Sequence, residues 1–147
     1  MMTQNQTSSA IAHISGGRTC PRLRGTVRFS PRRDGTLVVA EICGLPVSNT
    51  GFFAFHIHEG GDCCGNGFPN TGGHYNPGGA EHPNHAGDLP PLLSDNGRAY
   101  SQVLTGRFRV EDIIGRTVVV HAGADDFFTQ PSGNAGRKIG CGVVRWA

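Results

Sequence analysis

Apolar and polar residues alternate with a period of two in short segments along most of this chain, and no amphipathic stretch reaches the length of a helix. Such alternation is typical of strands with one buried face. The 23 glycines and 9 prolines indicate many turns and long loops between these segments. The pattern therefore predicts an all-β fold, either a sandwich or a flattened barrel.

Eight segments are interpreted as strands because they combine alternation with flanking turn residues. They are residues 10–14, 23–29, 36–42, 51–58, 98–105, 107–110, 117–121 and 139–146. Asp34-Gly35 predicts a hairpin turn between the second and third strands. Residues 59–93 and 122–136 lack periodicity, and loops of this length inside a compact domain are usually functional.

The 147 residues contain no internal repeat or boundary, which predicts one domain over 1–147 with residues 1–9 as a flexible N-terminus. A net charge of +2 does not indicate a nucleic-acid or membrane partner. Six arginines between Arg18 and Arg33 are interpreted as a solvated strand face. The polar first ten residues and the absence of a membrane-length apolar run predict a cytoplasmic protein, or a periplasmic or extracellular one if a leader has been removed.

His56-Ile57-His58 places two imidazoles on one face of a predicted strand, about 7 Å apart between Cα atoms. Alone, this pair is better explained by two exposed histidines. His121 ends another predicted strand and would join the pair if the two strands are neighbours. Three or four imidazoles suit copper(II) better than a hard cation.

Four further candidate ligands follow in the first long loop. They are His74, His82, His85 and Asp88. Three nitrogens and one oxygen suit tetrahedral zinc, and the spacings of three residues allow a tight turn to close on the ion. Together the two groups use six of the seven histidines, which argues against scattered surface residues.

From about Gly25 to the C-terminus, these motifs resemble the copper/zinc superoxide dismutase family. The matching segments are residues 51–59 (GFFAFHIHE), 73–77 (GHYNP), 85–90 (HAGDLP), 115–121 (GRTVVVH) and 133–136 (GNAG) before 141–143 (CGV). The resemblance implies an eight-stranded Greek-key β-barrel or immunoglobulin-like sandwich with two long active-site loops. It also implies disproportionation of superoxide to dioxygen and hydrogen peroxide, with one copper and one zinc per chain.

Carried over by position, the resemblance implies a role for each matching residue. Copper would be held by His56, His58, His74 and His121; zinc by His74, His82, His85 and Asp88. His74 would bridge the two ions and take part in catalysis, Asp125 would tether one histidine of each set, and Cys63 would pair with Cys141. Where the family has its active-site arginine this chain has Lys138, so either Lys138 or its neighbour Arg137 is expected to guide the anion.

Several alternatives stay open. Cys64 adjoins Cys63 and could compete for its partner, while Cys20 and Cys43 could be buried thiols or pair with Cys64. The chain could also be a non-catalytic copper/zinc-binding protein, or a structural sandwich that uses only the zinc residues. Interface strands look like any other strands, so the sequence does not decide between a monomer and a homodimer.

Overall fold

The structure is a computed structural model that describes residues 8–147. Of the N-terminal segment expected to be flexible, residues 1–7 lie outside the described residues. Within the described part, the strands are β1 (Ala10–Gly16), β2 (Arg24–Arg32), β3 (Gly35–Cys43), β4 (Phe52–His58), β5 (Asp88–Leu93), β6 (Ala99–Thr105), β7 (Thr117–His121) and β8 (Lys138–Trp146). Two short helices, η1 (Pro69–Thr71) and α1 (Val110–Ile113), complete the described elements.

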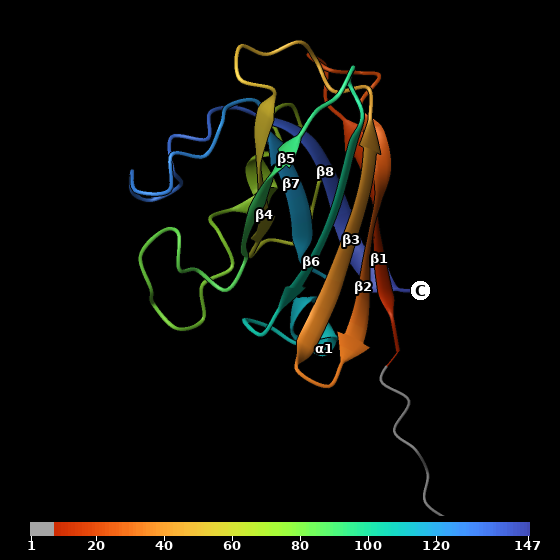
Figure 1. The fold of residues 1–147 in the computed structure, drawn as a ribbon, viewed down its shortest axis with the longest axis vertical. Helices are drawn as coiled ribbons and strands as arrows, with labels where there is room; N and C mark the ends of the chain where they lie inside the picture. Colours follow the sequence, from red (N-terminus) through yellow and green to blue (C-terminus); the bar gives the residue numbers. More distant parts are fainter. Residues whose placement is uncertain (1–7) are drawn as a thin grey trace, which may run out of the picture.

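The eight strands form one antiparallel sheet in the order β5-β4-β7-β8-β1-β2-β3-β6. The two end strands of this order, β5 and β6, lie against each other, so the sheet nearly closes into a barrel (Figure 1). Strands β1, β2 and β3 are successive neighbours, whereas β4 pairs with β7 and β6 returns to pair with β3. This connectivity is a Greek key, and the predicted all-β fold is confirmed.

Side-chain alternation explains why these segments form strands with one face in the barrel. On β2, Val27 and Phe29 are fully buried, while Arg24 and Arg28 are exposed, as the arginine pattern predicted. Strand β2 continues into β3 through the Asp34-Gly35 turn, with Arg32 opposite Gly35. Inward-facing residues from all eight strands meet in a single large core.

Two expectations about the strands are wrong. Residues 107–110 form no strand: the chain turns there into α1, where the Asp112 carboxylate accepts a hydrogen bond from the Arg109 amide at 2.9 Å. Phe108 and Val110 alternate with exposed arginines because both apolar side chains are buried at the end of the barrel. The ring of Phe108 packs edge-on against Phe29. Conversely, β5 lies inside the segment 59–93 that was expected to be a loop throughout.

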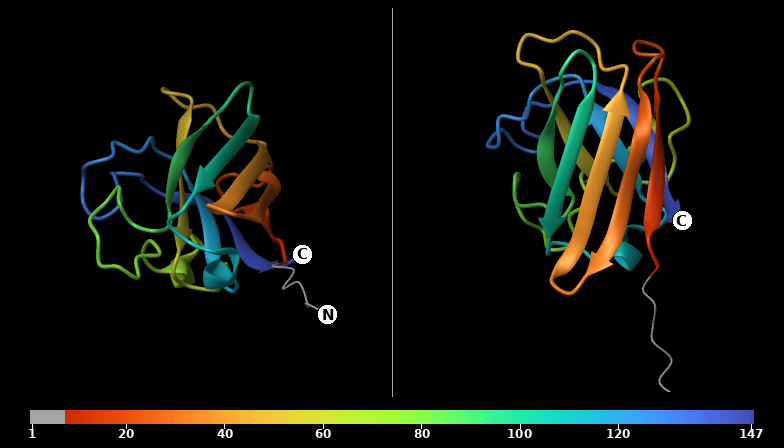
Figure 2. Two further views of the ribbon diagram at one scale, coloured as in Figure 1. Left: turned by 60° about the horizontal axis from the view of Figure 1, so that its bottom comes forward. Right: turned by 45° about the vertical axis from the view of Figure 1, so that its right-hand side comes forward.

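Both long loops lie on one side of the barrel, next to β4, β5 and β7 (Figure 1). The opposite face, formed by β1, β2, β3 and β6, is not covered by them (Figure 2). From residue 53 to 58, β4 is therefore buried on both faces: Phe55 and Ile57 face the core, and His56 and His58 lie beneath the loops. Among residues 8–147, no helix is long and apolar enough to cross a membrane.

Candidate metal centre

The six clustered histidines come from two neighbouring strands and the loop beside them. Strands β4 and β7 pair with His56 opposite Val119, which brings the end of β7 beside β4. The loop runs back along β4, where the Tyr75 amide donates to the Ile57 carbonyl at 2.8 Å. The histidines are His56 and His58 on β4, His121 at the end of β7, and His74, His82 and His85 in the loop, and all six are buried.

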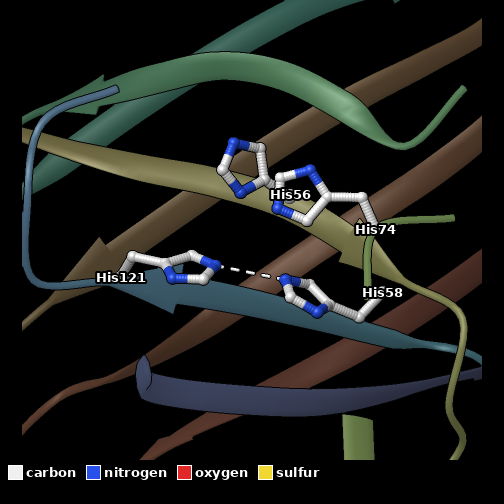
Figure 3. Close-up of side chains that lie close together, drawn as sticks. All are labelled: His56, His58, His74 and His121. Carbon is white, nitrogen blue, oxygen red and sulfur yellow. Dashed lines mark hydrogen bonds between the residues drawn. The ribbon is translucent and has the colours of Figure 1, made fainter. Parts of the chain in front are cut away.

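One group of four rings converges between β4, β7 and the loop (Figure 3). Its members are His56, His58, His74 and His121, and their ligand atoms all lie within 4.8 Å of one another. The outer nitrogens of two rings are fixed by the backbone: His58 Nδ1 donates to the Gly72 carbonyl at 2.8 Å, and His121 Nδ1 to the Gly136 carbonyl at 3.2 Å. Each ring therefore presents Nε2 to the shared centre.

The protonation of His58 and His121 makes this centre suited to a cation. Because a carbonyl oxygen only accepts hydrogen bonds, the proton of each neutral ring is on Nδ1 and a lone pair is on Nε2. Burial lowers the pKa of His58 to about 2 and that of His121 to about 3, so both rings are neutral near physiological pH. Their Nε2 atoms lie 3.1 Å apart with the lone pairs directed together, an arrangement that a metal ion stabilises (Figure 3).

The other two rings direct unpaired nitrogens at the same region. His56 Nδ1 and His74 Nε2 are buried and have no hydrogen-bond partner among residues 8–147. A buried polar atom without a partner costs free energy, unless a ligand completes its coordination. The four nitrogens therefore fit a metal ion that favours imidazole ligands.

A second group surrounds the carboxylate of Asp88 at the start of β5. His74 Nδ1 lies 2.8 Å from Oδ1, while His82 Nδ1 and His85 Nδ1 lie 3.0 and 3.1 Å from Oδ2. The His82 contact lacks hydrogen-bond geometry, and His82 Nδ1 is another buried nitrogen without a hydrogen-bond partner in the described part of the chain. Three nitrogens and one carboxylate fit a tetrahedral ion, and His74 contributes a nitrogen to each group.

Asp125 connects the two groups from outside. Its Oδ2 accepts from His56 Nε2 at 2.8 Å, and its Oδ1 accepts from His82 Nε2 at 2.7 Å. Burial alone would raise the pKa of Asp125, but the hydrogen bonds from these two rings hold it well below its usual range. With both Nε2 atoms protonated, the Nδ1 atoms of His56 and His82 are left free to bind metal.

The two candidate anion-guiding residues have different surroundings. Lys138 Nζ donates to Thr71 Oγ1 at 2.6 Å and to the Gly72 carbonyl at 3.2 Å. The same Gly72 carbonyl accepts the proton of His58 Nδ1, so Lys138 lies one carbonyl away from the four-histidine group. Arg137 has an exposed side chain, and among the described residues no hydrogen bond or ion pair involves its guanidinium.

The disulfide joins Cys63 to Cys141 and ties the first long loop to β8. Cys141 is 2% exposed and packs with Phe68 and Val119 in a small second core. The adjacent Cys64 is an exposed free thiol whose amide donates to Asp62. Cys20 and Cys43 are free thiols too, and both are half-buried.

Some groups that shape this centre were not predicted from the sequence. The carbonyls of Gly72 and Gly136 orient two rings, and the Thr71 hydroxyl holds Lys138. Backbone acceptors leave no signature in side-chain patterns, although Gly72 directly precedes the 73–77 motif and Gly136 is the last residue of the 133–136 motif.

The metal-free protein is expected to lose stability as the pH falls below about 6.5. Folding keeps His58 and His121 neutral, whereas the unfolded chain protonates them at their ordinary pKa of 6.5. Above pH 6.5 both rings are neutral in the folded and the unfolded chain, so the free energy of unfolding is not lowered by them. Below pH 6.5, each ring lowers the free energy of unfolding by about 1.4 kcal/mol per pH unit, until the pH reaches the pKa of that ring in the folded chain. Urea unfolding of chelated protein at stepped pH measures this slope, and a free energy of unfolding that stays constant in acid would contradict it.

Comparison with known proteins agrees with this geometry. The family model described as copper/zinc superoxide dismutase (SODC) matches residues 23–144. A curated copper/zinc superoxide dismutase of Aquifex aeolicus is 36% identical, covering 91% of this chain and 86% of the relative. One from Deinococcus radiodurans is 34% identical, covering 84% and 78%.

A solved structure has the same architecture. A double mutant of a SOD-like protein from Bacillus subtilis superposes with a TM-score of 0.78 at 28% identity, covering 90% of this chain and 95% of that one. The family model spans β4, β7 and the two loops, and both curated relatives cover most of the chain. The chain therefore belongs to the copper/zinc superoxide dismutase family.

Proposed function

We propose that this chain disproportionates superoxide at a copper site that shares one histidine with a zinc site. Two superoxide anions and two protons give one dioxygen and one hydrogen peroxide. The observation that carries the proposal is the ring of His74, whose two nitrogens belong to two different donor groups. Family membership supports the same activity.

The donor chemistry assigns the two metals. The all-nitrogen group would hold copper and the group with a carboxylate would hold zinc, one ion of each per chain. The copper residues would be His56, His58, His74 and His121; the zinc residues His74, His82, His85 and Asp88. Bound copper supplies reversible one-electron exchange with superoxide, and bound zinc supplies a fixed positive charge beside it.

The chain's own residues position the substrate and move the protons. His74 Nε2 has no hydrogen-bond partner among the residues that the structure describes, so this atom can hold a proton and donate it to the departing peroxide. Asp125 keeps the His56 and His82 rings in the tautomer that the site requires. Peroxide takes up two protons to leave as neutral hydrogen peroxide: His74 Nε2 would supply one and solvent water the other, which makes the proton position on His74 part of the reaction.

Lys138 is the residue we propose to guide superoxide. Its ammonium is anchored by Thr71 and Gly72 beside the four-histidine group, whereas within residues 8–147 no hydrogen bond or ion pair directs the Arg137 guanidinium there. A fixed positive charge near the reacting centre raises the local concentration of an anion. Lysine lacks the planar fork of arginine, so it attracts the anion but orients it less well.

Replacing Lys138 by alanine is expected to lower the second-order rate about tenfold and to flatten its salt dependence, because the attraction is electrostatic and screened by salt. Lys138→Arg should raise the rate above that of the natural chain. The measurement is the superoxide decay rate across a range of ionic strength, with Arg137→Ala as the matched control. If Arg137→Ala changes the rate and its salt dependence while Lys138→Ala does not, the roles are reversed.

Metal analysis tests the proposal against its alternatives. Protein loaded with both metals and freed of excess should contain about one copper and one zinc per chain. Zinc alone would favour a structural sandwich that uses only the second group. Both metals without turnover would favour the non-catalytic copper/zinc-binding protein.

A homodimer is the assembly that we propose. Phe52 and Leu93 lie opposite each other on β4 and β5 and are 41% and 58% exposed, and neighbouring exposed apolar side chains are typical of interfaces. Sedimentation velocity measures the assembly state.

For the compartment, the Cys63–Cys141 disulfide favours the periplasmic or extracellular alternative over the cytoplasm.

A further inference from the structure

Gln130 lies in the second long loop and is paired with the backbone of His82 in the first. The His82 amide donates to Gln130 Oε1 at 2.8 Å, and Gln130 Nε2 donates to the His82 carbonyl at 2.8 Å. The side-chain amide thus satisfies both backbone groups of His82, as a neighbouring strand would. Among the described residues these are the only hydrogen bonds of the His82 backbone.

The ring of His82 contacts the same loop independently. Its Nε2 donates to Asp125, and the Phe127 amide donates to the same carboxylate oxygen at 2.9 Å. At Gly133 an added Cβ would lie 2.1 Å from Asp125 Oδ1 and 2.5 Å from His82 Nε2, and its φ of 74° favours glycine as well. Backbone and ring of His82 are therefore both held by residues 125–133.

Gln130 is itself fixed within its loop. Its Nε2 also donates to the Phe128 carbonyl at 3.1 Å, and the Gly133 amide donates to the Thr129 carbonyl at 2.7 Å. Asp126 accepts from the amides of Phe128 and Thr129 and from the Thr129 hydroxyl. The turn therefore presents the Gln130 amide to His82 in a defined orientation.

We infer that Gln130 is a positioning residue for the zinc site. By pairing with the backbone of His82, Gln130 holds His82 Nδ1 towards Asp88. Asp125 fixes the tautomer of the His82 ring, and Gln130 fixes the position of the backbone that carries this ring. Zinc binding and the order of residues 125–133 are coupled through this pair: binding that fixes His82 also fixes the turn around Gln130. The inference rests on the proposed zinc site, but it concerns a residue outside the donor set.

Zinc affinity of the copper-free full chain tests this inference. Competition with a chromophoric chelator gives the zinc dissociation constant for wild type, Gln130→Ala, Gln130→Glu and Thr129→Val. Removing an outer partner of a metal ligand typically weakens binding about 10- to 100-fold, and we expect Gln130→Ala to fall in this range. Gln130→Glu keeps an acceptor for the His82 amide but replaces the donor by a carboxylate oxygen that faces the His82 and Phe128 carbonyls, so a loss comparable to that of Gln130→Ala is expected.

Thr129→Val is the matched control, because it removes a hydrogen bond of the same turn that does not touch His82. A merely structural role of the turn would weaken zinc binding equally in Thr129→Val and Gln130→Ala, and that result would overturn the inference. Gln130→Glu keeps the test decisive if Gln130→Ala does not fold. Wild-type protein that binds no zinc would overturn the proposed function and the inference with it.

Amide hydrogen exchange gives a second readout that does not depend on turnover. Zinc should slow exchange of residues 126–133 in wild type and in Thr129→Val, and slow it much less in Gln130→Ala. Equal protection by zinc in all three proteins would show that the coupling does not pass through Gln130.

Discussion

Replacing His74 by alanine is expected to weaken the binding of both metals and to lower superoxide disproportionation by more than about a hundredfold. Outer partners of metal ligands already contribute about 10- to 100-fold, and a residue that would bind both ions directly contributes more. The two nitrogens of this ring lie in separate groups: Nδ1 is 2.8 Å from Asp88, and Nε2 is unpaired beside His56, His58 and His121. The variant also loses the atom proposed to hold the proton.

Copper and zinc content after loading, followed by the rate of superoxide decay, measures this effect. The matched control is His13→Ala, because His13 is the one histidine outside the cluster and is exposed on β1. His13→Ala should keep both metals and the full rate. A His74→Ala protein that retains both metals, or loses only one of them, would contradict the bridging role of His74.

Replacing Cys63 by serine is expected to lower the free energy of unfolding by about 4 kcal/mol through loss of the cross-link. The Cys63–Cys141 bond joins residues 78 positions apart, and closing a loop of this length restricts the unfolded chain strongly. In the folded state the bond also anchors the first long loop to β8, since Cys141 is buried between Phe68 and Val119. The loop that carries His74 should therefore become less ordered as well.

Cys64→Ser is the matched control for the disulfide, because Cys64 is the next residue but its thiol is free and exposed. Urea unfolding of oxidised protein should separate the two variants clearly, with Cys64→Ser close to wild type. Equal losses in both variants would indicate that Cys64 shares the bond with Cys141. Cys63→Ser as stable as wild type would contradict the stabilising role of the disulfide.

The clustering of the candidate ligands could be predicted because short spacings and strand alternation constrain where side chains point. His56 and His58 share a face whenever residues 51–58 form a strand, and the spacings of three residues between His82, His85 and Asp88 allow a tight turn. Whether His121 lies beside His56 and His58 depended on the two strands being neighbours, and alternation does not reveal which strands are neighbours. Its confirmation required the sheet order, in which β4 lies beside β7.

The two errors in strand prediction have physical reasons. Strand β5 contains Pro90 and Pro91, which cannot donate to a ladder and are accepted only near a sheet edge, where β5 lies. Residues 107–110 alternate like a strand because Phe108 and Val110 both fill the end of the barrel. A pattern of two alternating apolar residues is too short to distinguish these cases.

Contacts between the loops could not be predicted, since they depend on the folded positions of residues far apart in the chain. Thr71 and Lys138 are 67 residues apart, and Gln130 and His82 are 48 apart. The sequence left the choice between Lys138 and Arg137 open for this reason. It also left open whether Cys63 or Cys64 pairs with Cys141, because the direction in which each of two adjacent side chains points depends on how the loop folds.

The rate of superoxide decay with the reconstituted chain tests the central claim most directly. Protein loaded with copper and zinc, freed of unbound metal by a chelator, should accelerate the decay in proportion to its copper content. The same preparation loaded with zinc alone should not. If the copper- and zinc-loaded chain is no faster than the zinc-loaded chain under the same chelator, the proposed activity is wrong and the chain is a metal-binding protein of this fold.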